Sequence, residues 1–125
     1  MALGSEKNFR PAAVVEVSGD FYEDIRVIKL RSRLGEGGLG YLVRLWCWAA
    51  KWRSDGSMYD ISDSAMEQAS EYAHFGGKPK EGNPPGDFAK ALRESGLLID
   101  DGENPCLGGL GEFVFFHKAP RRKRG

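Results

Sequence analysis

The sequence has little cysteine, no long apolar run and no net charge. Cys47 and Cys106 are its two cysteines, too few for a disulfide framework, so we expect a reducing, cytoplasmic environment. No segment reaches the roughly 18 consecutive apolar residues that a membrane span needs. The first residues also lack the apolar block of a signal peptide. We therefore expect a cytoplasmic protein with no membrane partner.

What is present suits one folded domain. The chain has 125 residues, of which 41% are hydrophobic and 11% aromatic, enough to build a packed core. Its 18 basic and 18 acidic side chains cancel. This balance excludes a polycation that coats nucleic acid by bulk charge alone.

The charges are unevenly distributed along the chain. Residues 1–117 carry 13 basic and 18 acidic side chains, and a basic cluster follows them. A short run rich in lysine and arginine predicts contact with nucleic-acid phosphates. The alternative is a solvated chain segment without a partner. The basic cluster consists of Lys118, Arg121, Arg122, Lys123 and Arg124.

Hydrophobic periodicity predicts four helices and several short strands. An Asp20–Glu23 capping box should open the first helix, and Ser62 should cap the third. Three prolines and four glycines make 76–86 a loop, and Gly96 should end the last helix. The expected helices are 24–34, 39–53, 62–75 and 87–95, and the expected strands are 13–17, 57–61, 97–99 and 112–116.

This order of elements predicts an α+β, mostly α, winged helix-turn-helix. In this plan 39–53 and 62–75 are the first two helices, and 87–95 is the recognition helix. Strands 97–99 and 112–116 form the wing, with its tip at 100–109. The expected organisation is a leader over 1–19, the winged-helix domain over 20–117 and a basic tail over 118–125.

Two segments carry a resemblance to a known family. The first is the aromatic-rich run Leu42–Ala50, followed by Asp55-Gly56. The second is Phe88-x-x-Ala91-Leu92-x-x-x-Gly96-Leu97-Leu98 before a hairpin. In this order they resemble the N-terminal winged-helix domain of phage and prophage replisome organisers, a group similar to DnaD-type primosome proteins. The resemblance implies double-stranded DNA binding in replication initiation or its control, without catalysis.

Four cations in or near the expected recognition helix are candidate DNA contacts. Lys90 and Arg93 lie three residues apart on its outward face, where arginine can bond guanine O6 and N7. Lys78 and Lys80 precede the helix and could hold phosphates, which fixes register without reading sequence. The alternative is an ordinary solvated helix face.

An acidic stripe favours a different function. Asp63, Glu67 and Glu71 are spaced by four residues on the expected helix 62–75, so they should share its outer face. Such a stripe would repel phosphates and suit a basic partner. This alternative makes the chain an adaptor that binds other replication proteins or a second copy of itself, with little DNA contact.

The remaining motifs give no support for an enzyme. The segment Gly35–Gly40 matches G-x-G-x-x-G, but a basic helix precedes it where a dinucleotide site needs a strand. The histidines and cysteines do not fall at metal-ligand spacing. Asp100, Asp101 and Glu103 could hold a divalent ion in a nuclease, although carboxylates at a turn are more simply turn formers. We expect no catalysis, no cofactor and no metal.

Overall fold

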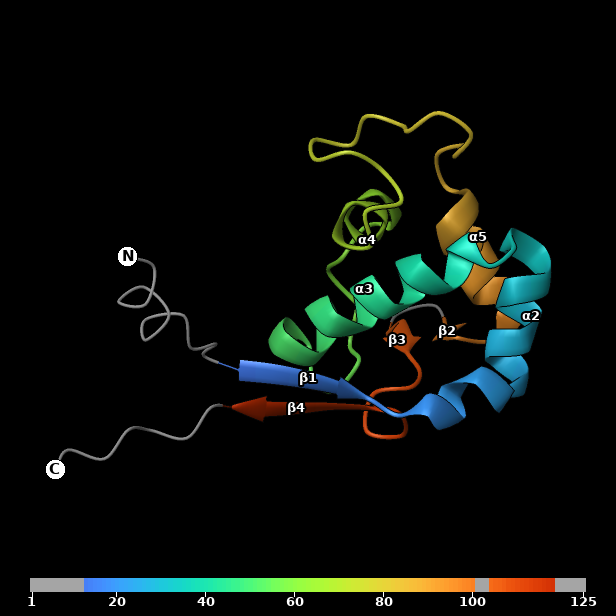
Figure 1. Cartoon of the computed structure of the whole chain (residues 1–125). Coiled ribbons are helices and arrows are strands. Elements are labelled where there is room, and N and C mark those ends of the chain that lie inside the picture. Colours follow the sequence, from blue (N-terminus) through green and yellow to red (C-terminus); the bar gives the residue numbers. More distant parts are fainter. Residues whose placement is uncertain (1–12, 101–103, 119–125) are drawn as a thin grey trace, which may run out of the picture.

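The structure is a computed structural model that describes residues 13–100 and 104–118. It is a mostly helical α+β fold with two small antiparallel sheets (Figure 1). The α-helices are α2 (Ile25–Leu34), α3 (Gly37–Trp52), α4 (Asp63–Ala69) and α5 (Asp87–Ser95), and a 3₁₀ helix, η1, covers Gly19–Glu23. The strands are β1 (Ala13–Val17), β2 (Leu98–Ile99), β3 (Cys106–Leu107) and β4 (Val114–Lys118).

Helix α3 forms the centre of the core. Its side chains Leu42, Leu45 and Trp46 are fully buried, and Phe88 of α5 is buried in the same cluster. In Figure 1, α3 passes between the β1–β4 ribbon and the pair α4 and α5. The expected core helix is confirmed, but it begins two residues earlier, at Gly37.

The early start of α3 has a packing reason. Gly35 ends α2 with φ 82, so the helix break is complete at that residue. Gly38 then lies against Leu34, where an added Cβ would come within 2.8 Å of the leucine Cβ. The segment Gly35–Gly40 is thus a helix–helix junction, as expected, although Gly37 and Gly38 are already helical.

The expected capping box is wrong. Ser18 caps η1 by accepting a hydrogen bond from the Asp20 backbone N–H. Helix α2 begins after Asp24, whose carboxylate accepts a hydrogen bond from the Arg26 N–H at 2.9 Å. Both are standard N-cap contacts. Two short helices, each with its own N-cap, therefore replace the single helix that one capping box would open.

The strand pairing expected for the wing is also wrong. β2 pairs antiparallel with β3, and the returning strand β4 pairs antiparallel with β1, with Val15 opposite Phe116. The strand expected within the leader 1–19 therefore belongs to the folded unit. The expected strand 57–61 is reduced to one bridge between Ser57 and Cys106, next to β3.

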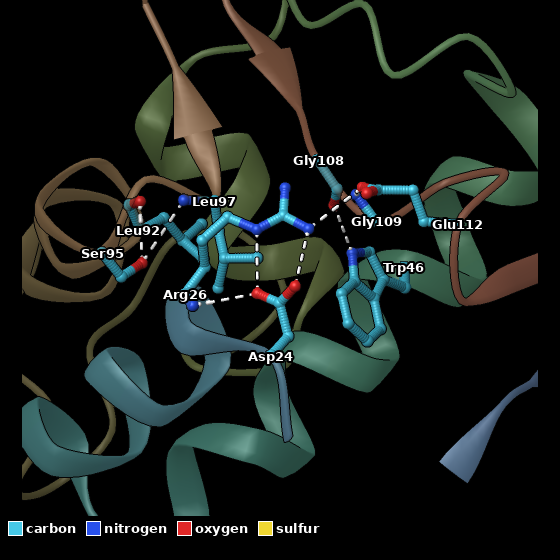
Figure 2. A network of polar contacts seen from close by, with 9 residues as sticks. All are labelled: Asp24, Arg26, Trp46, Leu92, Ser95, Leu97, Gly108, Gly109 and Glu112. Atoms are coloured by element: carbon cyan, nitrogen blue, oxygen red, sulfur yellow. Dashed lines mark hydrogen bonds and ion pairs between the residues drawn. The ribbon is translucent and has the colours of Figure 1, made fainter. Parts of the chain in front are cut away.

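Arg26 ties the start of α2 to the turn before β4 (Figure 2). Its guanidinium donates to both carboxylate oxygens of Asp24, at 2.9 and 3.1 Å, and to Glu112 Oε1 at 3.0 Å. Beside it, the indole N–H of Trp46 donates to the Gly108 carbonyl at 2.8 Å. Gly109 has φ 102, and an added Cβ would lie 2.5 Å from the Trp46 ring. Only glycine fits this close approach.

Candidate nucleic-acid interface

The helix expected to read DNA is present and packed as predicted. Phe88 and Leu92 of α5 are fully buried, and Gly96 ends the helix with φ 86. Lys90 lies exposed on the opposite side of α5. The helix therefore offers one exposed cation at the position where the sequence predicts a DNA contact.

Glu67 does not lie on an outer face. It is only 3% exposed, and its carboxylate accepts hydrogen bonds from the backbone N–H groups of Gly86, Phe88 and Ala89, at 2.9, 3.1 and 3.2 Å. Gly86 has no side chain to cap α5, so a carboxylate from α4 supplies the acceptor. The negative charge also suits the positive end of the helix dipole. The expectation that Glu67 lies on the outer face of its helix is wrong, because its carboxylate caps α5 inside the fold.

The other two members of the expected acidic stripe diverge as well. Asp63 pairs with Arg93, and Glu71 lies 3.6 Å from the Arg44 Nε. Helix α4 ends at Ala69, and Glu71 adopts the left-handed φ of 65, so the expected helix 62–75 is too long. The Ser70 hydroxyl donates to the Glu67 carbonyl at 3.0 Å and accepts from the Tyr72 N–H. These bonds turn the chain out of the helix.

Arg93 is committed to contacts within the fold. Two of its nitrogens donate to the two carboxylate oxygens of Asp63 at 2.8 and 3.1 Å, and its Nε lies 3.4 Å from Asp100 Oδ2. The hydrogen bonds to Asp63 raise the pKa of Arg93 above its ordinary value. A bidentate arginine–carboxylate pair uses the same donors that would read guanine. Arg93 therefore joins α5 to α4.

Ion pairs also join α5 to α2. Arg33 donates to Asp87 at 2.8 Å and to Glu94 at 3.0 Å. These contacts raise the pKa of Arg33, chiefly through the hydrogen bond to Asp87. The charged side chains of α5 other than Lys90 thus pair with neighbouring elements.

Lys78 lies in a small hairpin that the sequence does not predict, and Lys80 directly follows it. Ala73 and Pro79 form a single antiparallel bridge, and the His74 N–H donates to the Lys78 carbonyl at 2.8 Å. Lys78 is exposed. Lys80 donates a hydrogen bond from its ammonium to the Glu71 carbonyl. We call the segment from Ala73 to Pro79 the α4–α5 hairpin.

Phe75 lies at the tip of the α4–α5 hairpin and is 98% exposed. The Gly77 N–H donates to the His74 carbonyl at 2.9 Å, which closes a β-turn with Phe75 and Gly76 at its centre. Gly76 has φ 90, as the third residue of a type II turn requires. Sequence periodicity places Phe75 at the end of a helix, whereas the Gly76-Gly77 pair was the available signal for a turn.

The base of the segment between α4 and α5 is buried and hydrogen-bonded. The Tyr72 hydroxyl donates to the Pro84 carbonyl at 2.7 Å. The Asn83 amide donates to the Tyr72 carbonyl at 2.9 Å and to the Tyr41 hydroxyl at 3.1 Å. Burial raises the pKa of Tyr72 to about 12, with a contribution from the nearby Asp87 and Glu67 charges. This base fixes where the α4–α5 hairpin leaves the fold.

A cavity of about 310 Å³ lies between α4 and the segment that follows it. Its walls include Asp63, Glu67 and Asn83, all of which already have hydrogen-bond partners. Among the described residues, no group of three or more histidine, cysteine, aspartate or glutamate side chains could hold a metal ion. The cavity walls therefore offer no charged side chain that is free to hold a ligand.

The basic cluster is only partly within the described residues. Lys118 is the last residue of β4, opposite Ala13, whereas Arg121, Arg122, Lys123 and Arg124 lie outside the described residues. Asp101 and Glu103 lie outside them too. In the part of the chain that the structure covers, no helix is long and apolar enough to cross a membrane.

Comparisons with known proteins identify no relative. No family model matches the chain, and neither the curated proteins nor the solved structures contain a match. The resemblance to replisome organisers therefore stays a prediction from the sequence, as does the absence of catalysis.

Proposed function

We propose that this chain is a DNA-binding winged-helix protein, of phage or prophage origin, that acts without catalysis in replication initiation or its control. The observation that carries the proposal is the order of elements along the chain: α3, the bridge at Ser57, α4, α5 and then the β2–β3 hairpin. A winged helix has this order, with its recognition helix directly before the wing. In this proposal the β2–β3 hairpin takes the place of the expected 97–99 and 112–116 pair as the wing. The bridge between Ser57 and Cys106 joins the segment after α3 to β3.

The proposed mechanism differs from the sequence prediction in which cations reach DNA. Lys90 is the exposed cation of α5 and would approach the duplex from the recognition helix. Arg93 holds α5 against α4 and so positions the helix without touching bases. Lys118 and the four arginines and lysines of 121–124 would add affinity that is independent of sequence and falls with salt.

Fluorescence anisotropy with a labelled mixed-sequence duplex tests this function. The full chain and a version ending at Pro120 would be titrated at several salt concentrations. We expect the shortened chain to retain binding, and Lys90→Ala to weaken that binding by roughly 3- to 10-fold and reduce the salt slope by about one. Lys29→Ala is the matched control, because Lys29 is exposed on α2. If the shortened chain does not bind at all, the basic cluster alone makes the DNA contact and the winged helix makes none.

A second candidate function is the adaptor, and one observation favours it. The outer face of the β1–β4 ribbon exposes Val14 and Phe115 beside the Glu16–His117 contact. Exposed apolar side chains on a two-stranded ribbon can pair with a protein partner or a second copy. If the chain is an adaptor, light scattering should detect a stable oligomer, and Phe115→Ala should weaken that oligomer. Lys90→Ala should then leave duplex binding unchanged.

A further inference from the structure

We infer that the α4–α5 hairpin is a duplex-DNA contact in which Phe75 inserts at a base step while Lys78 holds the adjacent phosphate. The inference rests on the proposed function and adds a contact element to it. Its partner is double-stranded DNA, and its chemistry is an apolar wedge beside a cation.

Phe75 is the most exposed of the large hydrophobic residues among the described residues. An isolated exposed apolar side chain is ordinary on protein surfaces. Phe75 is unusual because it is 98% exposed on backbone that is held in place. The described residues leave the ring almost wholly uncovered, so it is available for contact with a partner.

The turn that carries Phe75 is held by a hydrogen bond to α4. The Gly76 N–H donates to Gln68 Oε1 at 3.0 Å, and Gln68 in turn donates from its amide to Ser64 Oγ at 3.2 Å. The turn is thereby attached to α4, in addition to its own two backbone hydrogen bonds. A side chain presented on fixed backbone loses little conformational entropy when it binds. This is the property of an interface anchor.

The position of the hairpin before α5 favours DNA as its partner. In a helix-turn-helix, the residues at the start of the recognition helix approach the bases, and the preceding helix crosses the backbone. The segment that connects α4 to α5 contains the α4–α5 hairpin. This segment ends at Gly86, which is the N-cap of α5. In Figure 1 this segment extends beyond α4 and α5, on the side away from β1 and β4.

The charges near the tip agree with a phosphate partner. Lys78 is exposed three residues after Phe75, and His74 is exposed directly before it. Of the nearby carboxylates, Glu67 is buried against the α5 backbone, and Glu71 is turned toward Arg44. Glu81 is exposed farther along the segment. Proteins that kink DNA commonly combine an inserted Phe or Leu with neighbouring cations in this way.

Binding of Phe75→Ala to a mixed-sequence duplex tests the inference on the full chain. We expect duplex affinity to fall about fivefold or more, since stacking on one base contributes on this scale. Lys78→Ala should reduce the slope of log affinity against log salt by about one. Trp52→Ala is the matched control, because it removes an exposed aromatic side chain at the C-terminal end of α3.

A second measurement reports on the base step itself. A duplex with internal 2-aminopurine should brighten when the unmodified chain binds, because an inserted ring unstacks the probe, and Phe75→Ala should not produce this signal at saturation. Unchanged affinity of Phe75→Ala would overturn the hairpin contact while leaving the proposed function in place. An equal loss in Trp52→Ala, or a loss seen on a single strand but not on the duplex, would also overturn it. Failure of the unmodified chain to bind any duplex would remove both proposals.

Discussion

The segment between α4 and α5 has a base and a tip that differ in how far their side chains are exposed to solvent. At its base, Tyr72 and the neighbouring Glu67 of α4 are almost fully buried. Their polar atoms form hydrogen bonds with backbone groups at the far end of the segment and at the start of α5. At its tip, Phe75 is in contact with solvent on nearly all of its surface. Hydrogen bonds hold the backbone of both parts, so the tip is exposed and yet ordered by its hydrogen bonds. The comparison shows that the base serves the fold and leaves the tip available for a partner.

The same contrast separates the charged residues of this part of the fold. Arg33 and Arg93 each bond two carboxylates and connect α5 to its neighbours. Lys78 and Lys90 are exposed. The arginines therefore act as structural cations and the two lysines are the candidates for phosphate contact. Planar arginine suits bidentate pairing with carboxylates, whereas lysine acts as a point charge.

The largest expected effect comes from the base. We predict that Glu67→Gln lowers the free energy of unfolding by about 2–3 kcal/mol, because the amide offers one acceptor oxygen and turns donors toward backbone N–H groups. Urea unfolding followed by circular dichroism at neutral pH measures this. Glu71→Gln is the control, since Glu71 is exposed, and its effect should stay within about 0.5 kcal/mol. Equal effects of the two substitutions would contradict the assignment of Glu67 as the cap of α5.

A smaller effect, with a distinct pH signature, is expected at Tyr72. Tyr72→Phe removes the hydrogen bond to Pro84 and should cost about 1 kcal/mol at neutral pH. The folded pKa of Tyr72 is raised to about 12 from the ordinary value of 10. The stability that its neutral phenol contributes is therefore fully present below pH 10 and is lost as the pH rises from 10 to about 12.

Urea unfolding of the two chains across this pH range measures the effect. The stability advantage of the unmodified chain over Tyr72→Phe should shrink between pH 10 and about 12, while other titrating groups affect both chains alike. Tyr59→Phe is the control, because Tyr59 is exposed. A constant difference between the two chains from pH 8 to 12 would mean that the Tyr72 phenol is not protected from ionisation.

The sequence predicts the apolar skeleton of this fold well. The helices α3 and α5, their buried faces, the Ser62 cap and the Gly96 stop follow from periodicity and capping residues. These features depend on residues close together in the sequence. Such local patterns predict the structure correctly because the side chains that pack in the core are the same apolar residues that set the helical periodicity.

The sequence predictions fail where a contact with a residue far away in the sequence determines the structure. Glu67 has the spacing of an outward residue on a long helix, but α4 stops at Ala69 and the carboxylate is taken up by α5. The pairing of β4 with β1 joins segments about 100 residues apart, and no local signal specifies it. Phe75 ends the expected helix because Gly76 and Gly77 predict only the start of a loop and do not specify the turn that the structure shows. Each error concerns a polar or tertiary contact that periodicity does not contain.

The smallest expected effect concerns the pair Arg93–Asp63, and it bears directly on which residues read DNA. Arg93 and Asp63 keep 35% and 46% of their side-chain surface exposed, so solvent screens their attraction. A double-mutant cycle with Arg93→Met and Asp63→Asn should give a coupling of about 0.5 kcal/mol, decreasing with salt. Because the guanidinium donors are occupied, Arg93→Met should change duplex affinity less than Lys90→Ala does. The opposite order, with no measurable coupling to Asp63, would mean that the pair opens and that Arg93 contacts DNA after all, as its position on the expected recognition helix first indicated.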